Sequence, residues 1–452
     1  MQVTQTLAEG LKREYRVVVP VTDLDAKVQE RLVELKDRVR INGFRPGKVP
    51  IEHLKRLYGR AVLAEAIEAA VREANTSIIA EHGFKLAMDP KVMLPEGEGE
   101  VAEMMAGKTD LAYSVALEVL PQIELGDFND IQLEKLTAEV SDAEVAEAID
   151  KIAEQNRPFA DKGEGAQAEQ GDKVTVAFTG TIDGQPFEGG TADDIGVVIG
   201  SKSFIPGFEE QLTGMKRGET RTVNAAFPQN YLSEHLAGKE ASFEVTAKLI
   251  EAPGTVTIDD EFAKSLGMES LAKLQDAVRE RIAREHAAVT RRRLKRALLD
   301  ALDERYHFDL PPTLVEQEFA NVWRTLLADL EAQGRTFADE STTEEKAREE
   351  YGKIAERRVR LGLVIAEIGE KNNIKVTDEE LTRAIVDRAR QFPGQEQQIW
   401  DHYRNNPSAI ASLRAPIYEE KVVDFLLELV KVAEKSVSGE ALYREDDEPA
   451  AA

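Results

Sequence analysis

The side chains of this chain that could do chemistry are mainly aromatic and cationic. The 452-residue sequence contains no cysteine, which excludes a disulfide, a thiolate nucleophile and a thiolate metal site. Its histidines do not show the paired spacing of metal ligands; they are His53, His82, His235, His286, His307 and His402. We therefore predict neither a metal nor a cofactor. Two patterns remain, a series of glycines and aromatic rings between residues 178 and 219 and a basic octapeptide at residues 43–50.

The first pattern belongs to a β-rich block that runs from about residue 171 to 251. For any single phenylalanine in it, the core of a small β-barrel is the simpler interpretation. The order of the motifs is more specific: Thr179-Gly180, Gly184 in a turn, Phe187-Glu188-Gly189, Ile205-Pro206-Gly207-Phe208-Glu209 and a glycine-rich turn at 214–219. This order resembles the FKBP-type peptidyl-prolyl isomerase family.

The resemblance implies an apolar pocket and its lining. The implied catalytic residues are Phe178, Phe187, Glu188, Ile195, Phe204, Ile205, Phe208, Tyr231 and Phe243. Glu188 stands where many family members carry an acid, and the backbone N–H of Ile205 is the implied donor to the substrate. Phe208 departs from the drug-binding members, which have tryptophan at this floor position, so affinity for immunosuppressants stays open.

An apolar pocket suits the implied reaction, the cis/trans isomerisation of Xaa–Pro bonds. Rotation breaks amide resonance, which imposes a barrier of roughly 18–20 kcal/mol and makes the uncatalysed step take tens of seconds. A dry pocket favours the twisted amide, because its carbonyl is less charge-separated than that of the planar amide. The reaction requires no proton transfer, nucleophile or metal, which agrees with the apolar residues that the resemblance implies. From this resemblance we predict a peptidyl-prolyl cis-trans isomerase.

The octapeptide at residues 43–50 predicts a rigid, exposed turn. Its two glycines and two prolines can neither continue a helix nor sit inside a sheet. From residue 36 to 60 the chain has eight Lys/Arg and two Asp/Glu, whereas the whole chain has a net charge of −26. A basic tip on an acidic protein is suited to contact a polyanion at one point. The alternative is a solvated helix-loop-helix whose charge has no function.

The octapeptide is also similar to the ribosome-docking signature of the trigger factor family, bacterial chaperones that meet nascent chains at the ribosomal exit tunnel. The implied ribosome-binding residues are Gly43, Phe44, Arg45, Pro46, Gly47, Lys48 and Pro50. Residues 310–319 resemble the C-terminal domain of the same family.

The length of the chain predicts about three domains. We place an N-terminal ribosome-binding domain at 1–115, a linker arm at 116–150 and the isomerase domain at 151–251. A helical chaperone domain follows at 252–436, and a disordered acidic tail at 437–452. The predicted fold class is multidomain α+β, with an N-terminal α+β domain, an FKBP-like β-rich domain and an all-α C-terminal domain.

Local patterns indicate the elements that must position the two candidate sites. Apolar residues at helical spacing predict helices at 22–41 and 60–82, the first capped by Thr22 and Asp25. Strands are predicted at 16–19 and, from strict alternation, at 111–119. Ser141 and Glu144 predict a capping box for an arm helix at 141–155. Long helices are predicted from 271 to 306 and near 343–371, 378–391 and 408–435.

Together these patterns predict a ribosome-associated chaperone that binds nascent chains and isomerises Xaa–Pro bonds. Two alternatives are a free-standing isomerase with substrate-recruiting flanks and a holdase with an inactive barrel; neither requires the basic tip. The N-terminal sequence lacks the pattern of a signal peptide, which predicts a cytoplasmic protein. The predicted partners are the large ribosomal subunit, through protein and rRNA, and unfolded polypeptides. We predict no DNA and no membrane partner, and a homodimer off the ribosome stays open.

Overall fold

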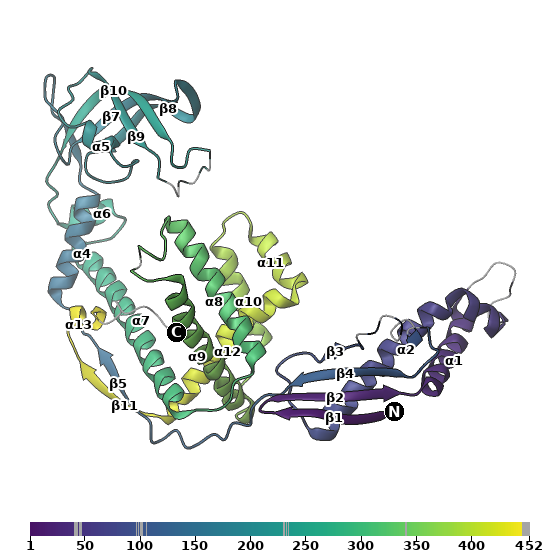
Figure 1. Cartoon of the computed structure of the whole chain (residues 1–452). Helices are drawn as coiled ribbons and strands as arrows, with labels where there is room; N and C mark the ends of the chain where they lie inside the picture. The colour runs from purple at the N-terminus through teal and green to yellow at the C-terminus, as the bar shows by residue number, and fades with distance from the viewer. Residues whose placement is uncertain are drawn as a thin grey trace.

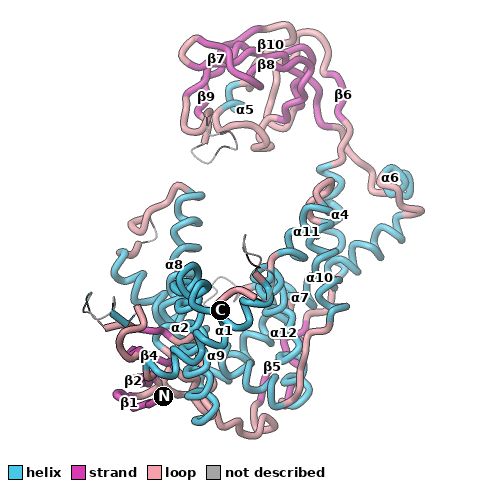
Figure 2. Tube along the Cα trace, turned by 90° about the vertical axis from the view of Figure 1, so that its right-hand side faces the viewer, coloured by secondary structure: helices cyan, strands magenta, loops and turns pink. Residues whose placement is uncertain are grey.

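The computed structural model describes residues 1–39, 44, 48–95, 97, 99, 103–104, 106–228, 231, 233, 235–339 and 341–444. An N-terminal α+β domain and a β-rich domain lie at opposite ends of the molecule, with a helical body between them (Figure 1). In the view turned by 90°, the β-rich domain again stands apart from the rest of the chain (Figure 2). The predicted fold class, multidomain α+β, is confirmed.

The N-terminal domain is an antiparallel sheet packed against a long helix. The strand order is β1 (Gln2–Glu9), β2 (Lys12–Val19), β4 (Leu111–Glu118) and β3 (Lys91–Met93). Alternate residues of β4 are buried, as predicted, and pack on Ile67, Ala70 and Ile78 of α2 (Ile51–His82). The sequence did not indicate β1, because all of its residues are exposed and it has no buried alternate face.

Helices α1 (Val21–Arg38) and α2 form a helical hairpin, and residues 39–50 connect them. The helices pack through a small apolar cluster that includes Val28, Leu32, Leu54 and Val62. The predicted cap by Thr22 and Asp25 is wrong: Pro20 is the N-cap residue, and the N–H of Val21 donates to Asp110 Oδ1 at 2.8 Å. Because this partner lies 89 residues away, no local pattern indicated it.

The β-rich domain is a strongly bent antiparallel sheet with one short helix. Its described strands run in the order β6-β10-β7-β8, and β9 pairs with the first half of β10. Valines from β7, β8, β9 and β10 fill its core, together with Phe208, Leu212 and Met215 around α5. The elements are β6 (Phe159–Asp161), β7 (Lys173–Ile182), β8 (Gln185–Val198), α5 (Phe208–Gln211), β9 (Thr220–Ala226) and β10 (Glu240–Pro253).

The helical body contains a large apolar cluster formed by α7, α9 and α12 together with the chain segment 123–133. Its helices are α6 (Asp260–Ser265), α7 (Leu271–Arg305), α8 (Pro312–Gln333), α9 (Glu344–Lys371), α10 (Asp378–Arg390), α11 (Glu396–Asn405) and α12 (Pro407–Leu429). The arm helix α4 (Asp142–Gln155) packs on α6 and α7, and its predicted capping box is confirmed. The arm helix therefore shares an apolar core with two helices of the body.

Two parts of the C-terminal region differ from the prediction. Residues 431–435, predicted as the end of a helix, belong to β11 (Lys431–Ser436), which pairs in parallel with β5 (Gln132–Thr137). Residues 439–443, predicted as part of a disordered tail, form α13 (Gly439–Tyr443), in which Leu442 is fully buried. The acidic composition behind that prediction begins only at residue 445, and residues 445–452 lie outside the described part of the chain.

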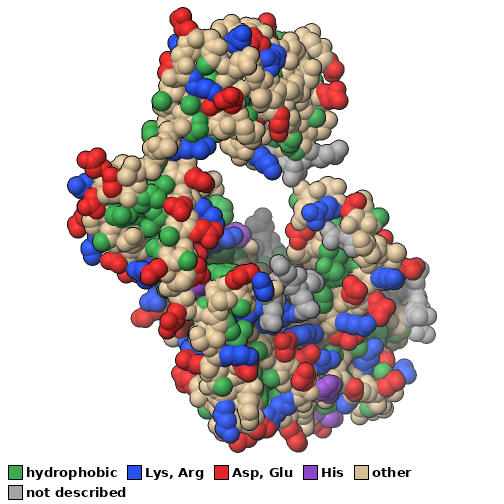
Figure 3. Space-filling model, turned by 90° about the vertical axis from the view of Figure 1, so that its left-hand side faces the viewer, with side chains coloured by type: hydrophobic (Ala, Val, Ile, Leu, Met, Phe, Trp, Pro, Cys, Tyr) green, Lys and Arg blue, Asp and Glu red, His purple; other side chains and the backbone are tan. Residues whose placement is uncertain are grey.

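Two crossings of the chain join the β-rich domain to the body. The first crossing passes through Pro158, which follows α4, and the second through Gly254, which follows β10. These two residues lie beside each other, because the Gly254 N–H donates to the Pro158 carbonyl at 2.7 Å. We call this pair of crossings the neck. The predicted boundary at 151 falls inside α4, whereas the two crossings meet at Pro158 and Gly254. In the space-filling view, the domain overhangs an open hollow and is attached at one side (Figure 3). Among the described residues, no helix has the length and apolar content needed to cross a membrane.

Candidate functional site

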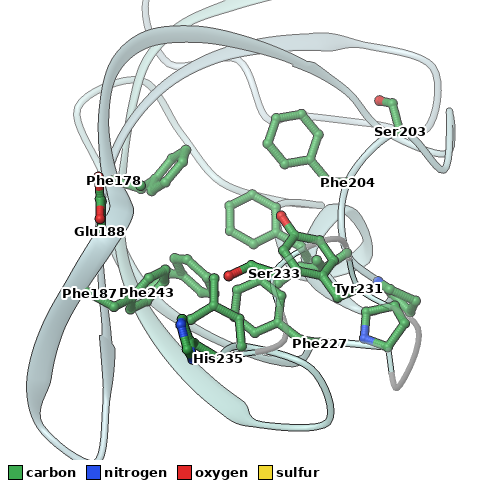
Figure 4. Close-up of a pocket in the computed structure, with 16 residues that line it drawn as sticks. Phe178, Phe187, Glu188, Ser203, Phe204, Phe227, Tyr231, Ser233, His235 and Phe243 are labelled. Atoms are coloured by element: carbon green, nitrogen blue, oxygen red, sulfur yellow. The ribbon is translucent and has the colours of Figure 1, made fainter. Parts of the chain in front are cut away.

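A cavity of about 920 Å³ opens in the β-rich domain (Figure 4). All of the predicted pocket residues line it except Ile195. The lining consists of Phe178, Phe187, Glu188, Gly189, Ser203, Phe204, Ile205, Pro206, Phe208, Phe227, Pro228, Tyr231, Ser233, His235, Leu236 and Phe243. Ile195 follows a register shift in β8, which pairs Phe178 with Ala192 but Val176 with Ile195, and its side chain is 38% exposed.

Phenylalanine rings in edge-to-face contact form the floor and walls of the cavity. Phe243 lies at their centre, with its ring centroid 5.7 Å from Phe178 and 5.4 Å from Phe208. Phe204 stacks on Phe208 at 5.4 Å from the opposite side. Such ring pairs stabilise one another beyond the effect of burial alone, and they hold the wall in one arrangement.

Gly180 shows why glycine belongs to this pattern. A β-carbon at Gly180 would lie 2.6 Å from Cε1 of Phe243 and 3.0 Å from Cε1 of Phe187. Real β-carbons do not approach ring atoms so closely, so any other residue would push the rings out of place. The glycine of the Thr179-Gly180 motif therefore makes space for the aromatic floor.

Sequence reasoning missed Phe227 as a lining residue. Its ring centroid lies 4.7 Å from that of Tyr231 and 5.9 Å from that of Phe187. A signal was present in the sequence, because Val223, Ala225 and Phe227 alternate along β9 and its end and all three are buried. Alternation alone assigns Phe227 to the core and does not say that the core is open at this point.

The loop that carries Phe204 and Ile205 is held by a buried carboxylate, which sequence reasoning also missed. Glu209 is only 3% exposed. Its oxygens accept hydrogen bonds from the backbone N–H groups of Gly200, Lys202, Ser203 and Phe204 at 2.8–3.0 Å and from Ser201 Oγ at 3.1 Å. Burial by itself raises the pKa of Glu209, but the hydrogen bonds outweigh it and lower the pKa below its usual value. Glu209 is therefore an ionised anchor for the upper wall of the cavity.

The polar groups of the cavity lie at its rim. Glu188 and His235 are exposed, and Ser203 and Ser233 belong to loops at the mouth. No described residue accepts a hydrogen bond from the backbone N–H of Ile205, so this donor is available to a bound carbonyl. No cluster of three or more His, Cys, Asp or Glu side chains able to hold a metal ion occurs among the described residues. The arrangement can desolvate an apolar group and offer one backbone donor.

The second candidate site lies in the segment that connects α1 and α2. Val49 is buried and anchors the chain before α2, whereas Phe44, Lys48 and Pro50 are exposed. The Phe44 ring lies 5.1 Å from that of His53, and its side chain is 38% exposed. The remaining predicted residues of this site, Gly43, Arg45, Pro46 and Gly47, lie outside the described residues.

Three family models match the chain. Bacterial trigger factor protein (TF) matches residues 1–152, FKBP-type peptidyl-prolyl cis-trans isomerase matches residues 164–248, and the bacterial trigger factor protein (TF) C-terminus matches residues 270–428. A protein named trigger factor from Azorhizobium caulinodans is 66% identical over 451 residues, which cover 100% of each chain. The chain belongs to the trigger factor family.

Further comparisons agree with this membership. Trigger factor from Rhodopseudomonas palustris (strain HaA2) is 60% identical over 452 residues, again 100% of each chain. A solved structure titled "Promiscuous Substrate Recognition in Folding and Assembly Activities of the Trigger Factor Chaperone" matches with a TM-score of 0.56 and 21% identity, covering 95% of this chain and 99% of the other. At this identity, the match supports the fold alone. Both predicted family resemblances are confirmed, so the chain is a trigger factor family chaperone whose cavity lies in an FKBP-type domain.

Proposed function

We propose that the β-rich domain catalyses cis/trans isomerisation of Xaa–Pro bonds in unfolded polypeptides. The observation that carries the proposal is a cavity walled by phenylalanines, with its polar groups confined to the rim. A proline ring enters among Phe178, Phe204 and Phe243, and water is excluded from the amide. The planar amide is more polar than the twisted one, so desolvation raises the ground state more than the transition state. The Ile205 N–H donates to a substrate carbonyl and orients it.

The test is an Xaa–Pro peptide isomerisation assay with the full-length protein. Phe204→Ala should lower kcat/KM, because the upper wall then admits water. Tyr443→Ala, which removes an exposed ring on the body, is the matched control and should leave kcat/KM unchanged. His235→Ala should retain most activity. A steep loss in His235→Ala with an intact fold would show acid–base chemistry and contradict the desolvation mechanism.

We further propose that the hairpin tip docks on the ribosome, near the exit tunnel of the large subunit in the bacterial cytoplasm. The support is the net positive segment 36–60 on a chain of charge −26, together with the exposed Phe44 and Lys48 in the segment that connects α1 and α2. Contacts between cations and rRNA phosphates release counterions, so binding should weaken steeply as salt rises. A ring beside the cations adds a contact for protein or bases.

Co-sedimentation with ribosomes tests this docking. The triple variant Phe44→Ala, Arg45→Ala, Lys48→Ala should bind weakly and keep wild-type isomerase activity. A control that removes two exposed cations from α9, Lys346→Ala with Lys353→Ala, should bind normally. If the triple variant sediments like the wild type, the tip is not the docking site.

For the helical body, we propose weak, adaptable binding of nascent and unfolded chains. Exposed apolar side chains on its helices include Leu327 of α8, Val386 of α10 and Phe392 after α10, and an open hollow lies beneath the β-rich domain. Together with the basic tip and the cavity, these features favour a ribosome-associated chaperone over the two alternatives. A free-standing isomerase would not need the basic tip, and a holdase with an inactive barrel would not need the cavity.

A deletion separates the two proposed activities. Because the neck holds Pro158 and Gly254 together, residues 159–253 can be replaced by a short flexible linker without moving the body. The deletion variant should still suppress light scattering of an aggregating client and should lose isomerase activity. If it is folded and monodisperse but fails to suppress scattering, the β-rich domain is part of the client-binding surface.

A further inference from the structure

The sheet of the N-terminal domain has one long edge that no described strand covers. Strand β1 pairs with β2 on one side, and its other side has no partner strand among the described residues. All eight residues of β1 are exposed. Figure 1 shows β1 at the margin of the sheet. Such an edge presents a row of backbone N–H and C=O groups, with which another extended chain can pair.

The other edge strands of the described sheets are short, charged or covered. Strands β3 and β6 have three residues each, and β11 has charged side chains at three of its six positions. Strand β8 contains Pro186 and several acids. On β9, the Asn224 N–H donates to Gln211 Oε1 at 3.2 Å, and the Asn224 carbonyl accepts from Gln211 Nε2 at 2.8 Å. On β5, the Leu136 carbonyl accepts from Thr290 Oγ1 of α7 at 2.7 Å.

Strand β1 lacks these protections. Residues 2–8 read Gln-Val-Thr-Gln-Thr-Leu-Ala, without a charge or a proline. The side chains of Val3 and Leu7 are each 39% exposed, so they can pack against the side chains of an added strand. A bulge lies between Gln5 and Leu7, and the hydroxyl of Thr6 donates to the Glu14 carbonyl at 3.1 Å. The bulge bends the strand and shortens any continuous run of pairing, which keeps binding at this edge weak and reversible.

The register of the sheet identifies the backbone groups that face outward. The Leu11 carbonyl accepts a hydrogen bond from the Val119 N–H at 2.9 Å, so residue 11 bonds on the β4 side. Successive residues of an antiparallel strand bond alternately to its two neighbours. The even-numbered residues of β2 therefore bond to β1, and the β1 residues opposite them are Gln2, Thr4, Leu7 and Glu9. By the same alternation, Val3, Gln5 and Ala8 direct their N–H and C=O groups away from β2.

We propose that β1 binds unfolded polypeptides by strand addition, in which an extended segment pairs with the outward groups of Val3, Gln5 and Ala8. These contacts join backbone to backbone, so they do not depend on the sequence of the bound segment. Proline is excluded at the bonding positions, because it has no N–H. The uncharged edge accepts segments of either sign. This inference rests on the proposed binding of unfolded chains, and it adds a site outside the helical body.

Amide hydrogen exchange of the full-length protein, followed by NMR, tests the pairing. In the free protein, the amides of Val3, Gln5 and Ala8 should exchange fast, whereas β2 protects those of Thr4 and Leu7. A saturating, soluble peptide of alternating threonine and valine should slow the first set several-fold and leave the second set nearly unchanged. The same peptide with proline in place of each valine is the control and should slow neither set. If the threonine–valine peptide slows none of the outward amides, the proposal is wrong.

Variants of one position separate the backbone from the side chain. Val3→Pro removes an outward N–H without breaking the pairing with β2, and edge strands tolerate proline at such positions. It should weaken binding of the fluorescently labelled peptide several-fold, whereas Val3→Ala keeps the N–H and should retain most of the binding. Gln5→Lys, which places a charge on the edge, should also weaken binding and serves if Val3→Pro does not fold. Wild-type binding by Val3→Pro or by Gln5→Lys, with an intact fold by circular dichroism, overturns the proposal.

Two further outcomes assign the occupant. If the outward amides are protected without peptide, and increasingly so at higher protein concentration, β1 pairs with a second copy of the chain and the assignment to unfolded polypeptides is wrong. If the peptide leaves the β1 amides unprotected while the protein still suppresses light scattering of an aggregating client, the β1 site is refuted and the proposed chaperone function stands. Protection of β1 without suppression of scattering would support the site and contradict that function.

Discussion

Replacing Glu209 is expected to loosen the upper wall of the cavity. Its carboxylate accepts four backbone hydrogen bonds and one hydroxyl hydrogen bond at 2.8–3.1 Å. At about 1.5 kcal/mol for each bond to a charged acceptor, the gross contribution is large, but burial of the carboxylate offsets several kcal/mol of it. Glu209→Ala should therefore destabilise the loop by about 3 kcal/mol. Glu209→Gln keeps one acceptor oxygen and should cost about 1–2 kcal/mol.

The effect should reach catalysis, because the loop carries Phe204 and Ile205. Each 1.4 kcal/mol by which the loop stabilises the transition state of isomerisation less well lowers kcat/KM by about 10-fold. We expect half or more of the lost loop stability to be lost from this transition state. Glu209→Ala should lower kcat/KM by about 10- to 100-fold, and Glu209→Gln by less. Glu210→Ala is the matched control, since Glu210 is adjacent, exposed and of equal charge. It should behave like the wild type.

Hydrogen exchange of the backbone amides measures the stability of this loop. Tryptophan fluorescence does not report on it, because Trp323 and Trp400 both lie in the body. The folded pKa of Glu209 is lowered, so its stabilisation is present above the unfolded pKa and is lost as the pH falls through the folded value. The difference in exchange between the wild type and Glu209→Gln at residues 200–204 should therefore shrink at acid pH. Unchanged exchange and unchanged kcat/KM in Glu209→Ala would refute the anchoring role.

Two further perturbations test the floor of the cavity and the body. Gly180→Ala should destabilise the β-rich domain by about 1–3 kcal/mol and lower isomerase activity, because the added β-carbon would clash with the Phe243 ring. Hydrogen exchange of the β7 amides measures this loss of stability. Exchange as slow as in the wild type would contradict the packing argument. In α10, the hydrogen bond from Lys421, together with the Thr377 backbone, lowers the pKa of Glu380 to about 2 from 4.5. Its contribution is present above about pH 4.5 and is lost as the pH falls toward 2, so thermal unfolding of Glu380→Gln should depend less on pH in that window than that of the wild type.

Short-range patterns carried much of the prediction. The capping box of Ser141 and Glu144 closes within one helical turn, so the four-residue pattern is sufficient to predict it. The alternation of β4 likewise shows which side chains face the core, whatever lies opposite. The glycine and aromatic series of the β-rich block predicted the pocket because each motif occupies a turn or a wall that few residue types can fill.

The sequence by itself determined the family, the three-part architecture and half of the cavity lining, because these depend on residue types that neighbours along the chain constrain. Only the tertiary structure decided that Glu209 is a buried anchor, that Ile195 lies outside the cavity, and that β5 and β11 pair across almost 300 residues. A carboxylate, an isoleucine or a short polar strand has the same local pattern whether it is exposed or buried. Its environment is set by partners that are distant in the chain, and the free energy of those contacts exists only once the chain has folded.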